Sequence, residues 1–156
     1  MITIDVSIPP ALARKLSPQA CERALVATLT ACARDYQGRI AKYPGRSHSP
    51  VIWQSEKQRR YYFAMRREQG LPAKYTRGSD PGSQRLGASW TVERKGRLEW
   101  TVGTRVTYAR FVQSRAAQQR QHSATGWKTV DRAAEEFVRS GVIARYATAA
   151  AKQELG

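Results

Sequence analysis

The sequence has few of the residues from which catalytic and metal sites are built. Its 156 residues include two cysteines, two histidines and 12 acidic residues, which are mostly scattered singly. No glycine-rich phosphate loop follows a strand pattern, and no cysteine and histidine spacing matches a metal site. His48 and His122 lie in polar runs without a neighbouring base or nucleophile, so we expect both to be solvent exposed. The sequence therefore predicts a protein that is not an enzyme, and it indicates no cofactor.

The low cysteine content also excludes a disulfide framework. Cys21 and Cys32 are eleven residues apart in one helical pattern, which separates them by about 16 Å along a helix axis. Two unpaired thiols suit a reducing compartment. The start of the chain, MITIDVSIPP, lacks the pattern of a secretion signal, and no apolar run approaches the length of a membrane span. We expect a soluble chain made in the cytoplasm, without membrane partners.

Acidic residues are too few to balance the basic ones. The chain has 27 Lys and Arg against 12 Asp and Glu, which gives a formal charge of +15. A surplus of this size repels itself unless polyanions or acidic proteins lie nearby, so nucleic acid is the first partner to consider. A basic surface that serves only solubility is the alternative. A hydrophobic content of 41% nevertheless indicates a folded chain, with a single domain over residues 1–156.

The hydrophobic pattern predicts an α+β fold in which a long N-terminal helix packs on a small antiparallel sheet. Residues 2–8 alternate between apolar and polar side chains, which is typical of a strand. Ser17 is a suitable cap for a helix with Pro18 in its first turn, and the helix should end at residues 43–45. Its apolar stripe is expected to form the core: Leu25, Leu29, Cys32, Tyr36 and Ile40.

The second half of the chain changes to a period of two and then returns to a helical period. Residues 88–102 predict a hairpin with its turn at residues 95–96, and 105–112 predict a third strand that completes a meander. A polar loop follows, which we expect to be flexible. Two helices should end the chain, separated by Gly141.

An insertion at about residues 46–85 carries the strongest local concentration of charge. A capping box at Ser55 and Gln58 predicts a helix that runs to about Glu68. One interpretation is an amphipathic helix that buries Tyr62 and Met65 and exposes a basic face. The other is a platform on which single-stranded nucleic acid stacks. The candidate face for DNA or an acidic protein consists of Lys57, Arg59, Arg60, Arg66 and Arg67.

Four segments follow one another in an order that is found in a known protein family: a long helix ending in AKYPG, then RLGASWTVE, then VGTRVTYARFVQ, and a polar loop leading to GWKTVDRAAEE. Together these segments resemble the tailed-bacteriophage family of head-to-tail joining, tail-completion and minor tail proteins. The family pattern has a Gly-x-Leu-x-x-Ser step into a hairpin and a Tyr-Ala-x-x-Val-Glu step that ends the sheet. Residues 86–90 and 108–113 stand at these two steps. Gln113 replaces the usual Glu, and SRAAQQRQHS replaces the usual short Gly-Thr loop.

The resemblance implies a structural protein of the virion neck or tail, made in the cytoplasm of the host bacterium. Such subunits form a homo-oligomeric ring at the head-to-tail junction or tail end, beside portal, adaptor or tail-tube proteins, and phage DNA contacts the ring transiently as it passes. The candidate subunit-contact region is Tyr108, Phe111, Gln113, Arg115 and Arg120. The alternative is a basic nucleic-acid-binding accessory protein, whose DNA affinity would fall steeply with salt.

Overall fold

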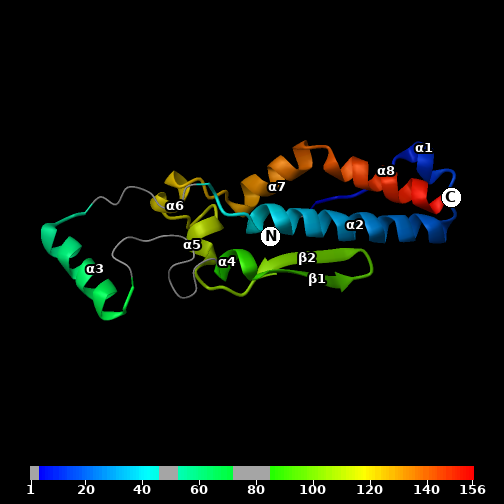
Figure 1. Ribbon diagram of the computed structural model, residues 1–156. Coiled ribbons are helices and arrows are strands. Elements are labelled where there is room, and N and C mark those ends of the chain that lie inside the picture. The colour runs from blue at the N-terminus through cyan, green and yellow to red at the C-terminus, as the bar shows by residue number, and fades with distance from the viewer. Residues whose placement is uncertain (1–3, 46–52, 72–84) are drawn as a thin grey trace.

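The computed structural model describes residues 4–45, 53–71 and 85–156 and confirms an α+β fold with a long N-terminal helix (Figure 1). Helices dominate, and the described strands form one antiparallel hairpin. The elements are α1 (Pro10–Ala13), α2 (Pro18–Ala41), α3 (Glu56–Glu68), α4 (Arg85–Ala88), β1 (Trp90–Gly96), β2 (Glu99–Thr104), α5 (Ala109–Gln113), α6 (Arg120–Ala124), α7 (Val130–Arg139) and α8 (Val142–Glu154).

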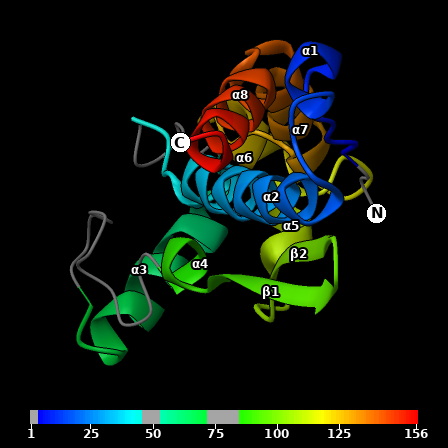
Figure 2. The ribbon, with the colours of Figure 1, turned by 90° about the vertical axis from the view of Figure 1, so that its right-hand side faces the viewer.

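Helix α2 is the centre of the body and is covered on two sides. Figure 2 shows α7 and α8 on one side of α2 and the hairpin of β1 and β2 on the opposite side. Ser17 begins α2 as predicted, because its hydroxyl accepts a hydrogen bond of 3.2 Å from the Ala20 amide. The helix ends at Ala41, where Lys42 adopts an extended backbone two residues before Pro44.

The buried row of α2 differs from the predicted stripe. The buried residues recur at every fourth position. Each step of four residues advances the side chain by about 40° around the helix axis, so the buried row winds around α2. This winding lets α2 bury side chains against elements on both of its sides. Leu25 and Leu29 are only half-buried, and the prediction that they lie in the core is wrong. The buried row is Ala20, Ala24, Thr28, Cys32, Tyr36 and Ile40.

Small residues allow α2 and α8 to approach closely. Ala24 of α2 and both Ala147 and Ala151 of α8 have no exposed surface, and these two helices form the most extensive helix contact of the described residues. A leucine at this contact would hold the helices apart, which is why the alanines and not the leucines are buried. Gly141, with φ of +67°, makes the sharp turn between α7 and α8 in the left-handed region that favours glycine.

The largest fully buried side chain of the core is Phe137 of α7, which is 1% exposed. Its ring meets that of Tyr36 edge to face, with the centroids 5.8 Å apart. The Tyr36 hydroxyl donates a hydrogen bond of 2.9 Å to the Val130 carbonyl, and burial raises the pKa of this phenol to about 12. Trp90 and Leu86 bring the hairpin and α4 to the same core.

The predicted N-terminal strand and third strand are absent from the described residues. Residues 4–9 have no regular secondary structure, and Ile4 packs against the core and lies beside α7. Residues 105–112 turn into α5 instead of a strand. Val106, Ala109 and Val112 pack on the core at a spacing of three, which is a helical period. Within residues 4–45, 53–71 and 85–156, the sheet therefore consists of the hairpin alone.

The position of the hairpin turn also differs from the prediction. The hairpin turn lies at residues 97–98, two residues later than predicted, because the register shifts between Arg94 and Gly96. The polar loop is not irregular throughout, since residues 120–124 form α6. The Gln118 amide donates hydrogen bonds to the carbonyls of Val112 and Trp127, at 2.7 and 2.9 Å, and so joins the loop to the body.

The two cysteines have different environments, which predicts different reactivity. Cys21 is half-buried, whereas Cys32 is buried, and burial together with the charge of Asp35 raises the Cys32 pKa to about 11. The thiolate population of Cys32 should be about a hundredfold below that of an ordinary thiol. We expect a mass-spectrometric time course with iodoacetamide to show Cys21 alkylated first and Cys32 modified only on unfolding. Equal rates in the folded chain would contradict the burial of Cys32.

Candidate assembly surfaces

The predicted helix of the insertion exists and is capped as expected. The Ser55 hydroxyl accepts a hydrogen bond of 3.1 Å from the Gln58 amide, and the Gln58 side chain accepts one of 2.8 Å from the amide of Gln54. The hydrogen bond that the Gln58 side chain accepts thus comes from the residue before the cap. In Figure 1, α3 lies apart from the body that α2 organises.

The basic residues of α3 do not all share one exposed face. Lys57, Arg59, Arg60 and Arg67 are exposed, but Arg66 is 7% exposed, and its guanidinium lies 5.7 Å from the centroid of the Tyr62 ring. Arg66 is therefore buried, contrary to the prediction that it joins the exposed basic face. The aromatic ring and the aliphatic part of arginine can pack together while the charge is retained.

The apolar residues of α3 are more exposed than they would be if this helix packed against the core of its own chain. Tyr61, Tyr62 and Met65 are 67%, 38% and 37% exposed, respectively, so the expected burial of Tyr62 and Met65 is wrong. Trp53 packs against Tyr62 and Phe63, with centroids 5.1 and 5.9 Å apart. These ring contacts pack Trp53 against the helix, but they leave one stripe of apolar side chains exposed. We call Tyr61, Tyr62 and Met65 the α3 apolar face.

The predicted subunit-contact region is divided by the structure. Tyr108, Arg115 and Arg120 are exposed and Phe111 is half-buried. Gln113, in contrast, is 3% exposed, and its amide nitrogen donates a hydrogen bond of 2.9 Å to the carbonyl of Ile40 in the last turn of α2. Gln113 thus satisfies a helix-end carbonyl inside the subunit, so its placement on a contact surface is wrong.

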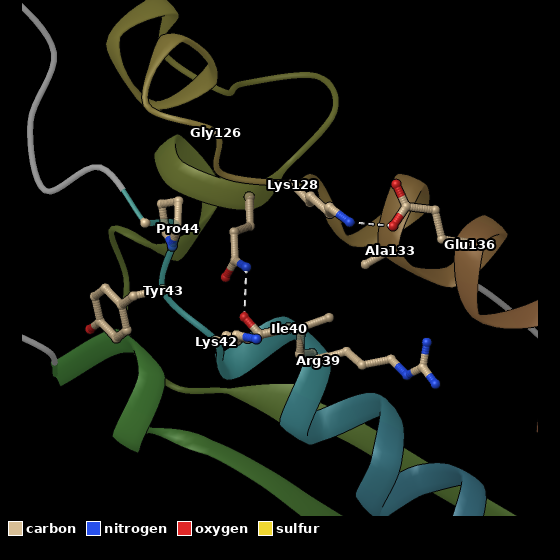
Figure 3. A pocket seen from close by; sticks show the side chains of 11 residues that line it. Arg39, Ile40, Lys42, Tyr43, Pro44, Gly126, Lys128, Ala133 and Glu136 are labelled. Carbon is tan, nitrogen blue, oxygen red and sulfur yellow. Dashed lines mark hydrogen bonds and ion pairs between the residues drawn. The ribbon is translucent and has the colours of Figure 1, made fainter. Parts of the chain in front are cut away.

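A polar pocket of about 360 Å³ lies at this end of α2 (Figure 3). Lys128 forms an ion pair with Glu136 across its wall, and the hydrogen bond from Lys128 lowers the pKa of that carboxyl. Gln113 also lines the pocket, and its side-chain oxygen is buried without a hydrogen-bond partner among the described residues. The pocket could accept one hydrogen-bond donor of a bound molecule. It holds no pair of residues that could act as nucleophile and general base. The sequence pattern does not reveal this pocket, because residues 39–45 and 126–136 meet only in the fold.

A second depression, of about 370 Å³, lies between the N-terminal segment and α7. On α7 its residues repeat at intervals of three and four, the pattern of a single helix face. Val138 stands out there because it is 49% exposed. We call this depression the α7 groove, and it is lined by Ile4, Arg115, Asp131, Ala134, Glu135, Val138 and Arg139.

Other kinds of site find little support in the part of the chain that the structure describes. No group of three or more His, Cys, Asp and Glu residues there could hold a metal ion. None of the described helices is both long and apolar enough to cross a bilayer. His122 is half-buried, contrary to expectation, and burial lowers its pKa below the usual value, while His48 lies outside the described residues.

Comparisons of the chain with protein-family models, with curated proteins and with solved structures found no match. The function of the chain must therefore be inferred from the surfaces described above and from the motifs of the sequence.

Proposed function

We propose that this chain is a structural subunit of a tailed-phage virion, which assembles as a homo-oligomeric ring at the head-to-tail junction or tail end. The observation that carries the proposal is the α3 apolar face, with Tyr61 67% exposed in a chain of charge +15. Exposed apolar patches on a highly charged soluble chain mark protein contacts. A helix with such a face suits a subunit whose apolar surface is covered by a neighbouring subunit.

The charge of the chain supports a position along the path of the genome. Lys57, Arg59, Arg60 and Arg67 are exposed on the same helix that carries the apolar face. A conduit that bound DNA through many phosphate contacts would retard its exit, so the attraction should be weak and sensitive to salt. Portal, adaptor or tail-tube proteins are the neighbours of such a ring. This role requires no catalysis.

A basic nucleic-acid-binding accessory protein is the second candidate. Tyr61 favours it, because an exposed aromatic ring beside Arg60 can stack on an unpaired base. The two candidates predict different measurements. An accessory protein should shift the mobility of DNA at moderate salt with a steep salt dependence, whereas a ring subunit should sediment as an oligomer and be present in particles.

Reversing the four exposed basic residues of α3 to Glu tests the proposal. We expect the thermal midpoint of the isolated chain to change little, because exposed charges contribute little to stability. Particle assembly or DNA retention should fail, and counting infectious particles measures this. The matched control reverses four exposed basic residues of the body: Arg14, Lys15, Arg145 and Lys152. Normal particle numbers from the α3 variant, or equal losses from both variants, would contradict a specific role of α3.

A further inference from the structure

Two separate surfaces of the described chain expose apolar side chains within a helical stripe. One is the α3 apolar face. The other is the α7 groove, where Val138 is exposed, Ile4 is half-buried and Ala134 forms a buried part of the wall. An apolar helix face and a groove with an apolar wall are the two halves of a helix-in-groove contact.

We propose that the α3 apolar face of one copy of this chain docks into the α7 groove of a neighbouring copy. The inference rests on the proposed ring and names the contact that would build it. Because the two surfaces differ, the contact is head to tail, and a contact of this kind produces a closed ring when its rotation closes.

The charges around the two surfaces are complementary. On the helical wheel, Lys57 and Arg59 lie on opposite sides of the α3 apolar face, and both are exposed; Arg59 also lies 3.5 Å from Glu56 of the same helix in an exposed ion pair. The groove contributes the carboxylates of Asp131 and Glu135, one turn apart on α7. Arg115 and Arg139 also line the groove, and Arg139 lies 3.6 Å from Glu135 in an exposed ion pair. Exposed Glu68, beside Lys57 on the wheel of α3, can face either arginine.

The size of the side chains agrees with this pairing. Tyr61 and Met65 are one turn apart and can project together into a groove of about 370 Å³, which two such side chains would largely fill. The polar pocket at the end of α2 is a poorer acceptor for apolar side chains, because more of its lining surface is polar than in the α7 groove.

Disulfide trapping in the full chain tests the contact directly. The variant carries Met65→Cys and Val138→Cys, with Cys21→Ser to remove the half-buried native thiol. Mild oxidation should give a ladder of covalent multimers, with the 65–138 bond identified by mass spectrometry. The matched control pairs Met65→Cys with Lys152→Cys, an exposed position on α8, and should remain uncross-linked.

The possible outcomes separate this contact from the ring itself. A monomer-sized product with an internal 65–138 bond would show that α3 occupies the groove of its own chain and would overturn the inference. An oligomer in sedimentation without that bond would overturn the inference but not the ring. A chain that stays monomeric at all concentrations and is missing from particles would overturn both.

A charge exchange gives a second, independent measurement. Arg59→Glu and Glu135→Arg should each raise the dissociation constant of the oligomer about tenfold, while the double variant should recover most of the loss. Additive losses in the double variant would show that these two residues do not meet, and would overturn the assignment.

Discussion

Replacing Phe137 with alanine is expected to lower the free energy of unfolding by about 3 to 5 kcal/mol. Phe137 is the largest of the fully buried side chains and contacts the ring of Tyr36 at a centroid distance of 5.8 Å. The guanidinium of Arg39 also lies over its ring, 5.1 Å from the centroid. Truncation would thus leave a cavity between α2 and α7 and remove two ring contacts. Urea unfolding followed by tryptophan fluorescence measures the loss.

The adjacent residue supplies the control for this substitution. Val138 is 49% exposed on the same helix, so Val138→Ala should change the stability of the isolated subunit by less than about 0.5 kcal/mol. The same variant should still weaken assembly if the α7 groove is an interface. A loss below about 1 kcal/mol for Phe137→Ala would mean that α7 does not pack on α2 as described.

Replacing Gly87 with alanine is expected to destabilise the subunit by about 2 to 4 kcal/mol. A Cβ atom at this position would lie 2.5 Å from Cε2 of Tyr43 and 2.8 Å from the carbonyl oxygen of Ala41. The amide of Gly87 also donates a hydrogen bond of 3.1 Å to the Tyr43 hydroxyl. Because one of the atoms in contact is backbone, a side-chain rotation cannot relieve the overlap. Thermal unfolding measures the effect.

Gly38 is a suitable control because it lies within α2 and is exposed, and a methyl group added there would meet no atom of a neighbouring element within 4 Å. Gly38→Ala should stabilise the chain by about 0.5 to 1 kcal/mol, since alanine has the higher helix propensity. If Gly87→Ala were as harmless as Gly38→Ala, the close approach of α4 to the end of α2 would be wrong.

The features that could be predicted from the sequence are those that local chemistry determines. Ser17 and Ser55 each cap the helix that follows them. The first backbone amides of a helix lack partners within the helix, so a serine hydroxyl just before it can accept a hydrogen bond from one of them in any tertiary fold. The hairpin could be predicted because apolar and polar residues alternate in both of its strands. Its turn lies two residues from the predicted place because the irregularity between Arg94 and Gly96 leaves no clear mark in the pattern.

The features that could not be predicted depend on which elements meet. Leu29 has the hydrophobicity of a core residue, but the close contact with the alanines of α8 favours small residues of α2 such as Ala24. Arg66 and Gln113 have polar side chains in polar runs, and only the fold brings them to buried positions. For the candidate site, sequence reasoning identified the basic helix, but the exposure of Tyr61 and the α7 groove depend on how the elements pack in three dimensions.

The attachment of α8 to α2 offers a way to determine the orientation of the subunit in a particle. Arg23, near the start of α2, forms an ion pair of 2.6 Å with Glu154 at the end of α8, and Tyr146 donates a hydrogen bond of 3.1 Å to Asp35. These bonds keep residue 156 at the end of the body opposite α5 and α6 (Figure 1). A fluorescent or gold label at this end would mark one pole of a helix about 36 Å long, and its radius and height in particle images would give the direction of α2.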